Sequence, residues 1–227
     1  MSSRMRIGIT HGDINSISYE VIMKALLDPR ILEDCTPILY GSSKVAAYHR
    51  KTLNINNLSF NAIRTADEAS PRKANLINCI NDEVRVELGK STPQAGEAAF
   101  LALKKAVEDL KAGKIDALVT GPINKHNIQS EQFSFPGHTE YLAREFGAED
   151  VLMFMVGETM RVGVVTGHVP LAEVAQLITT DKILQKIHLM NQSLREDFAI
   201  PRPRIAVLGL NPHAGDQGII GREDMDV

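Results

Sequence analysis

The sequence is poor in the residues that build disulfide and redox proteins. Two cysteines, Cys35 and Cys79, occur among its 227 residues, far apart and without Cys-x-x-Cys spacing. This pattern argues against a disulfide framework and against a structural zinc site, and it favours two buried thiols in a reducing compartment.

The chain also lacks the segments that are typical of membrane and nucleic-acid-binding proteins. It has no run of about 18 apolar residues, and Met1–Arg6 leads directly into an apolar strand without a signal-peptide pattern. The net charge is −3 and no basic run occurs, so nothing indicates nucleic acid or an anionic membrane as a partner. We therefore expect a cytoplasmic protein.

Short apolar runs and helical periods alternate along the chain, whose 44% hydrophobic and 23% charged residues suit a sizeable core. One helix is predicted from the N-cap Thr92 and Pro93 to Gly113, and another from Thr180 to about Asp197. The alternation predicts an α/β fold, a mostly parallel sheet with helices on both faces. The predicted strands are Ile7–Thr10, Pro37–Tyr40, Leu58–Ile63, Ile115–Thr120, Val151–Val156, Arg161–Thr166 and Arg204–Leu208.

Three histidines follow predicted strands. His168 and His213 each lie on the loop directly after a strand, and His138 follows one less closely. A single histidine in such a place often only hydrogen-bonds a neighbouring loop, but each of these lies near a glycine or proline that lets the backbone approach a ligand. Because imidazole is the commonest protein ligand of zinc and similar ions, we predict that His168 and His213 bind a divalent metal. This pattern alone also allows a metal-dependent hydrolase or aldolase.

Four short motifs carry these histidines and the end of one strand: Val119-Thr120-Gly121-Pro122-Ile123-Asn124-Lys125, Gly137-His138-Thr139-Glu140, Thr166-Gly167-His168-Val169-Pro170-Leu171 and Gly209-Leu210-Asn211-Pro212-His213-Ala214-Gly215. Together, and in this order, they resemble the 4-hydroxythreonine-4-phosphate dehydrogenase family of pyridoxal phosphate biosynthesis. The resemblance implies oxidation of the C3 hydroxyl of 4-phosphohydroxy-L-threonine, followed by decarboxylation, with NAD or NADP and a divalent metal such as zinc, magnesium or cobalt. It also implies a homodimer and a two-lobed architecture like that of isocitrate and isopropylmalate dehydrogenases.

The same resemblance implies roles for individual residues. His168 and His213 match metal ligands, and His138 and Thr139 match a pair that contacts the substrate. Asp13 and Lys125 are candidates for proton transfer or for contact with phosphate. For Asp13 the alternative is a cap on the helix expected near Tyr19, and for Lys125 it is a solvated lysine at a helix start.

The remaining histidines are assigned structural or solvent-exposed positions: His11, His49, His126 and His188. Of these, His11 could also face a cleft, because it opens the turn after the first strand, and His126 could contact phosphate. No Gly-x-Gly-x-x-Gly occurs, so a Rossmann dinucleotide site is not expected. NAD is therefore implied by the family resemblance alone.

The chain departs from the family pattern in two places. Where the family has Gly-Asp-x-x-Gly-Ile-Gly, serines stand at Ser16 and Ser18, and a serine would strain the loop by roughly 1 kcal/mol if its position required positive φ. The family also continues beyond Val227, with a third metal histidine in a Tyr-His-Asp-Gln-Gly motif and a Lys, an Asn and an Arg that hold the phosphate.

We therefore expect two α/β lobes, residues 1–125 and 126–227, the second incomplete at its C-terminus. A sister dehydrogenase of a four-carbon sugar-acid phosphate, phosphoerythronate or phosphothreonate, remains an alternative. A third possibility is a non-catalytic fragment, and we expect the 227 residues alone to be inactive and to self-associate.

Overall fold

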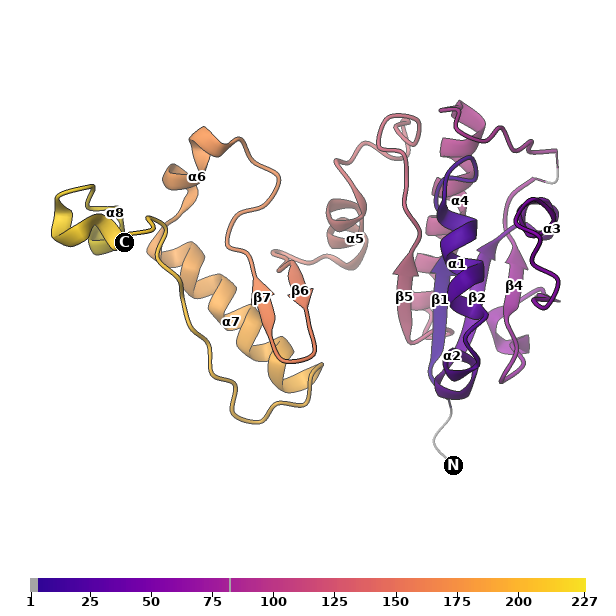
Figure 1. Cartoon of the computed structure of the whole chain (residues 1–227), viewed down its shortest axis with the longest axis horizontal. Helices are drawn as coiled ribbons and strands as arrows, with labels where there is room; N and C mark the ends of the chain where they lie inside the picture. Colours follow the sequence, from indigo (N-terminus) through magenta and orange to yellow (C-terminus); the bar gives the residue numbers. More distant parts are fainter. Residues whose placement is uncertain (1–3, 82) are drawn as a thin grey trace. The chain divides into compact units, whose positions relative to one another are not determined.

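The computed structural model describes residues 4–81 and 83–227 of the chain. It forms two compact units, Met1–Ala148 and Glu149–Val227 (Figure 1). The first unit therefore ends later than the boundary that we expected after Lys125. The reason is hydrophobic packing, because Phe133 and Tyr141 are buried against the longest helix of the first unit.

The first unit is built on a five-stranded sheet in the order β3-β4-β2-β1-β5 (Figure 1). Every pair of neighbouring strands is parallel, which confirms the predicted α/β class. The strands are β1 (Arg6–Thr10), β2 (Thr36–Gly41), β3 (Asn61–Ile63), β4 (Asn75–Asn78) and β5 (Ala117–Thr120).

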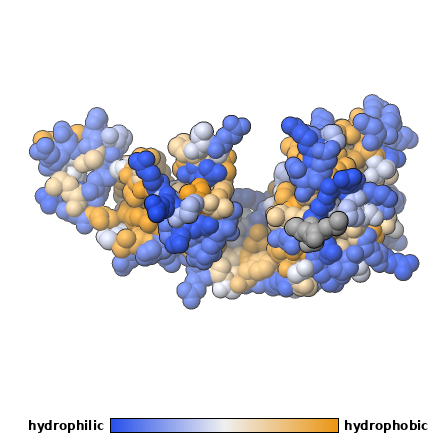
Figure 2. All heavy atoms as spheres, turned by 90° about the horizontal axis from the view of Figure 1, so that it is seen from below, coloured by the Kyte–Doolittle hydropathy of each residue, from blue (hydrophilic) through white to orange (hydrophobic). Residues whose placement is uncertain are grey.

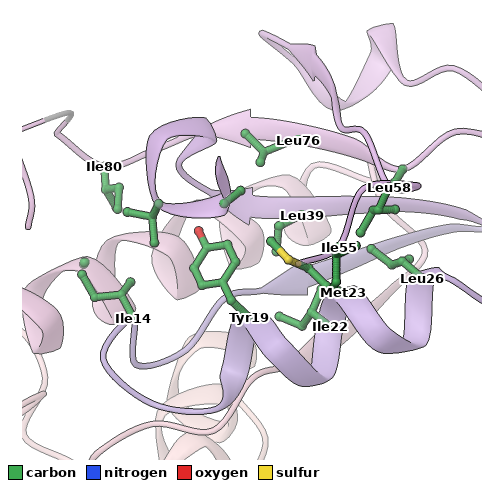
Figure 3. Close-up of a cluster of buried hydrophobic side chains, with 14 of the residues drawn as sticks. Ile14, Tyr19, Ile22, Met23, Leu26, Leu39, Ile55, Leu58, Leu76 and Ile80 are labelled. Carbon is green, nitrogen blue, oxygen red and sulfur yellow. The ribbon is translucent and has the colours of Figure 1, made fainter. Parts of the chain in front are cut away.

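Helices cover both faces of this sheet, as predicted. They are α1 (Ser18–Leu26), α2 (Pro29–Asp34), α3 (Ser43–Thr52), α4 (Pro93–Lys111) and α5 (His138–Phe146), with a short 3-10 turn at Ala66–Glu68. The alternation of side chains along β2 separates the two faces. Leu39 packs with Met23 of α1 in one cluster (Figure 3), whereas Ile38 and Tyr40 pack with Ala106 of α4 in another.

Helix α4 begins and ends where the sequence predicts. Thr92 Oγ1 accepts a hydrogen bond from Ala95 N at 3.3 Å, and Pro93 is the first helical residue. Near its other end the buried Asp109 accepts hydrogen bonds from the Tyr40 hydroxyl at 2.9 Å and from Lys105 Nζ at 3.0 Å. These bonds attach α4 to the middle of the sheet, and burial together with the Asp109 carboxylate raises the pKa of Tyr40.

The second unit contains the hairpin β6 (Phe154–Val156) and β7 (Arg161–Gly163), which is antiparallel. Its helices are α6 (Leu171–Leu177), α7 (Thr180–Glu196) and α8 (Glu223–Asp226), with a 3-10 segment at Ala214–Gly218. Helix α7 confirms the predicted second helix, and Thr179 Oγ1 caps it by accepting from Lys182 N at 3.2 Å. Lys186 is buried in this unit and binds the Asp150 carboxylate.

The predicted strand Arg204–Leu208 is wrong, because this segment has no strand partner among the described residues. A β-strand requires a neighbour for its backbone N–H and C=O groups, and here Leu208 is 87% exposed. For the same reason the two strands predicted at 151–156 and 161–166 shorten to three residues each. Hydrophobic residues, among them Leu171 and Leu208, reach the surface of this unit (Figure 2).

Two smaller differences concern the first unit. The strand predicted at Leu58–Ile63 begins only at Asn61, and β4 was not predicted, because asparagines at both of its ends obscure its short apolar middle.

Among the described residues, no helix combines the length and the hydropathy needed to cross a membrane.

Candidate functional site

The neighbouring strands β1 and β5 end beside each other, and the chain leaves them toward opposite faces of the sheet. Helix α1 follows β1 and packs on one face with Leu39. The chain after β5 packs with α4, through Ile128 and Tyr141. This is a topological switch point, and parallel α/β sheets bind ligands outside the carboxyl ends of the strands at such a point.

The loops that follow β1 and β5 are in direct contact. Gly121 N donates to Thr10 O at 2.9 Å, and Asp13 N donates to Pro122 O at 2.8 Å. Gly12 lies between them with φ +65, and a Cβ atom there would lie 2.3 Å from Pro122 O. The contact therefore requires glycine at position 12, both for its backbone angle and for its lack of a side chain.

Neither serine that replaces a family glycine has positive φ, so the strain that we considered for Ser16 and Ser18 is absent. Ser18 instead adds a bond, because its buried hydroxyl donates to Pro122 O at 2.9 Å. Ser16 is exposed beside a pocket at the same place. Both positions thus accept a side chain without distorting the loop.

Asp13 is buried, and both of its carboxylate oxygens are held. One oxygen accepts from Asn15 N at 2.8 Å and the other from Asn127 Nδ2 at 3.2 Å. The capping alternative for Asp13 is wrong, because α1 has Ile17 at its N-cap and no side chain caps it. The carboxylate is instead fixed between the two loops.

A pocket of about 490 Å³ opens beside these loops, within the first unit. Its wall includes Asp13, Ser16, His49, Lys90 and Asn124. This volume and the mixture of polar and apolar groups are typical of sites for small molecules.

Lys125 and His138 approach each other at the start of α5. Burial lowers the pKa of His138, and the positive charge of Lys125 lowers it further. His138 Nε2 is buried and has no hydrogen-bond partner among the described residues, while Lys125 is exposed and Thr139 is half-buried. Asn127, two residues beyond Lys125, links this segment to Asp13.

The two predicted metal ligands lie in the second unit. His168 is exposed, and its backbone lies in the left-handed region, with φ 55. His213 is also exposed and precedes the 3-10 segment Ala214–Gly218. Its backbone N–H donates to Asn211 Oδ1 at 3.1 Å. No group of three or more His, Cys, Asp or Glu residues that could hold a metal occurs in the described part of the chain. A catalytic zinc needs about three protein ligands, so metal binding by these two histidines stays a prediction.

Two further histidines lie beneath the switch point. His11 is fully buried, and neither ring nitrogen has a partner with hydrogen-bonding geometry among the described residues. Burial lowers its pKa to about 4, and the backbone near Ala98 and Gly12 offsets only part of this effect. His11 stacks on Tyr19, which stacks on His49, with ring centroids 5.5 and 4.9 Å apart. These contacts agree with structural roles for His11 and His49, although His49 also lines the pocket.

Three asparagines that no sequence signal singles out organise the site: Asn15, Asn124 and Asn127. Each lies on a loop within a few residues of a candidate that was recognised. Asparagine is common in loops, so its type and position alone do not distinguish a buried organiser from an ordinary turn residue.

The family profile described as "Pyridoxal phosphate biosynthetic protein PdxA" matches residues 33–227. The chain belongs to the PdxA family. It is 50% identical, over 226 residues, to the 4-hydroxythreonine-4-phosphate dehydrogenase of Bacteroides thetaiotaomicron, and the match covers 99% of this chain and 62% of that protein.

Two further matches have lower sequence identity. The chain is 36% identical to a protein of Symbiobacterium thermophilum named "Putative D-threonate 4-phosphate dehydrogenase", with 99% of this chain and 68% of that protein covered. A crystal structure of 4-hydroxythreonine-4-phosphate dehydrogenase from Klebsiella pneumoniae matches with TM-score 0.88 and 29% identity, over 100% of this chain and 68% of that one. This PdxA-family chain thus spans about two thirds of the length of these relatives.

The contact between the loops predicts different effects for two glycines with similar backbone angles. Gly113 has φ +67, but a Cβ atom there would have nothing within 4 Å. We expect Gly113→Ala to lower the free energy of unfolding by about 1 kcal/mol, and Gly12→Ala to lower it by about 3 kcal/mol, since it adds a clash to the same angular cost. Urea unfolding of both variants measures this, and equal losses would contradict the close approach at Gly12.

Burial of His11 predicts a dependence of stability on pH. Its pKa is lower in the folded protein than its usual 6.5, so the unfolded chain takes up the proton first as the pH falls. Stability should decrease from about pH 6.5 to pH 4, by about 3 kcal/mol from this residue. Urea unfolding at pH 6.5 and pH 4 measures this decrease. His11→Leu should lose about 3 kcal/mol less between these pH values than the wild type does. His188→Leu, which replaces an exposed histidine of α7, should lose as much as the wild type. Identical pH profiles for His11→Leu and the wild type would refute the role of His11.

Proposed function

We propose that the protein oxidises the C3 hydroxyl of 4-phosphohydroxy-L-threonine, with decarboxylation of the product, in pyridoxal phosphate biosynthesis. The observation that carries this proposal is the 50% identity to the Bacteroides thetaiotaomicron enzyme over nearly the whole chain. The pocket at the switch point and the fixed Asp13 beside it support a site for small molecules in the first unit. NAD or NADP as oxidant, a homodimer and a cytoplasmic location belong to the same proposal.

A second candidate substrate is D-threonate 4-phosphate, because several relatives are named as putative dehydrogenases of this compound. The two substrates share a phosphate and a secondary hydroxyl, and they differ at C2, where one has an amino group and the other a hydroxyl. The identity of 36% to those relatives, against 50% to the first, favours the amino-acid phosphate.

The residues of the first unit suit particular tasks in this reaction. A neutral His138 at pH 7 follows from its lowered pKa, and a neutral imidazole can accept a hydrogen bond or a proton from the substrate. Thr139 would orient the substrate beside it. The ammonium group of Lys125 would attract the phosphate or the carboxylate. Asp13, held by Asn15 and Asn127, offers a carboxylate of fixed orientation for proton transfer.

The residues of the chain fit the two cofactors to different degrees. The pocket volume and the uncapped N-terminus of α1, whose N–H groups favour anions, suit part of a dinucleotide. The nicotinamide would accept the hydride. For the metal, His168 and His213 form an incomplete set, so no step of the reaction is assigned to a metal.

The assay uses the protein as its gene encodes it, together with any residues that follow Val227, because we expect residues 1–227 alone to be inactive. We expect reduction of NAD or NADP with 4-phosphohydroxy-L-threonine and at least about tenfold lower kcat/KM with D-threonate 4-phosphate, in agreement with the cost of one misplaced polar group. His138→Ala should lower kcat/KM about a hundredfold, and His188→Ala should not change it. Reversed preference would favour the threonate phosphate, and no turnover with either substrate would refute the dehydrogenase.

Metal binding is tested separately. We expect calorimetric titration with zinc or cobalt to show binding to the wild type, and binding about tenfold weaker or more in the His168→Ala, His213→Ala double variant. His126→Ala with His188→Ala, two exposed histidines outside the proposed set, is the matched control. Equal affinities in the wild type and the first double variant would remove both histidines from the metal site.

A further inference from the structure

The segment between β4 and α4 passes the carboxyl end of the sheet, where Asn15 holds it. Asn15 is 3% exposed. Its Oδ1 accepts from Glu87 N at 2.7 Å, and its Nδ2 donates to Lys90 O at 3.0 Å and to Thr92 Oγ1 at 3.1 Å. Its backbone carbonyl accepts from Gly89 N at 2.9 Å. One buried side chain thus joins the loop after β1 to residues 87–92 and to the N-cap of α4.

The other side of this segment is attached to the loop after β5. Ser91 Oγ accepts from Asn124 Nδ2 at 3.1 Å. Leu88, Gly89, Lys90 and Ser91 all line the pocket, together with Asp13. Residues 88–91 therefore form a wall of the pocket, and hydrogen bonds from two asparagines, to Glu87, Lys90 and Ser91, hold this wall in place.

We propose that Asn15 is a positioning residue, which holds residues 87–91 in the conformation that receives the ligand of the pocket. This inference rests on the proposed function for the identity of the ligand, either the phosphorylated substrate or the dinucleotide. Asn15 itself borders the pocket, but its side-chain oxygen and nitrogen are bound to Glu87, Lys90 and Thr92, so it acts through the segment. Loss of the side chain should weaken binding rather than slow the chemical step.

The chain offers a matched control in Asn75. This asparagine is 1% exposed and donates to three backbone carbonyls, those of Pro37, Ser70 and Lys73. It lies at the amino end of β4, whereas the pocket lies beyond the carboxyl ends of the strands. Asn75→Ala therefore removes a comparable buried network without touching the pocket.

Two measurements test the proposal on Asn15→Ala. Amide hydrogen exchange by NMR should show Glu87 exchanging at least about tenfold faster than in the wild type, because its acceptor is gone. Steady-state kinetics should show KM for the substrate or for NAD raised about tenfold, with kcat changed less than about twofold, as expected when binding alone is lost. Asn75→Ala should show neither change. Asn15→Asp keeps an acceptor for Glu87 N and should restore its protection.

Either of two results would overturn the proposal. Unchanged exchange at Glu87 would show that Asn15 does not hold the segment, and faster exchange with both KM values unchanged would show that the segment is not part of the binding site. If the wild type turns over neither substrate, the proposed function fails instead. In that case the affinity for NAD, measured by calorimetry on the wild type and Asn15→Ala, replaces KM, and equal affinities overturn the role of Asn15.

Discussion

The first unit depends on the direct backbone contact between the loop after β1 and the loop after β5. Gly12 allows the loop after β1 to rest on the backbone at Gly121 and Pro122. Pro122 O accepts from both Asp13 N and the Ser18 hydroxyl. This contact fixes the first turn of α1, the Asp13 carboxylate and the pocket beside them, so the site depends on a backbone approach that only glycine permits.

Asparagines extend this contact into a polar framework. Asn127 reaches across to Asp13, Asn124 reaches Ser91, and Asn15 reaches the segment before α4. Amide side chains suit this task because each offers both a donor and an acceptor, and buried loop backbone must find partners for both kinds of group. The framework therefore gives three separate loops one defined arrangement through amide hydrogen bonds.

The sequence predicts the elements whose signals are local. Thr92 and Pro93 mark the start of α4, and the apolar run before His11 marks β1. The fold class could also be predicted from the alternation of strands and helices, and the family from its four motifs. The asparagine framework could not, because its partners lie far apart in sequence, as with Asn15 and Lys90. The strand predicted at Arg204–Leu208 failed because pairing requires a neighbour, which periodicity cannot supply.

The position of β5 has a consequence for folding. Strands β1 to β4 pair through connections of moderate length, but β5 joins β1 across the whole of α4, so that Arg6 N meets the Asp116 carboxylate 110 residues away. Contacts of such high sequence separation form late, because closing a long loop costs entropy before any pairing compensates for it. A chain in which the other four strands have formed therefore has a sheet but no switch point, and the pairing of β5 with β1 brings Ile123 and Asn124 to the pocket.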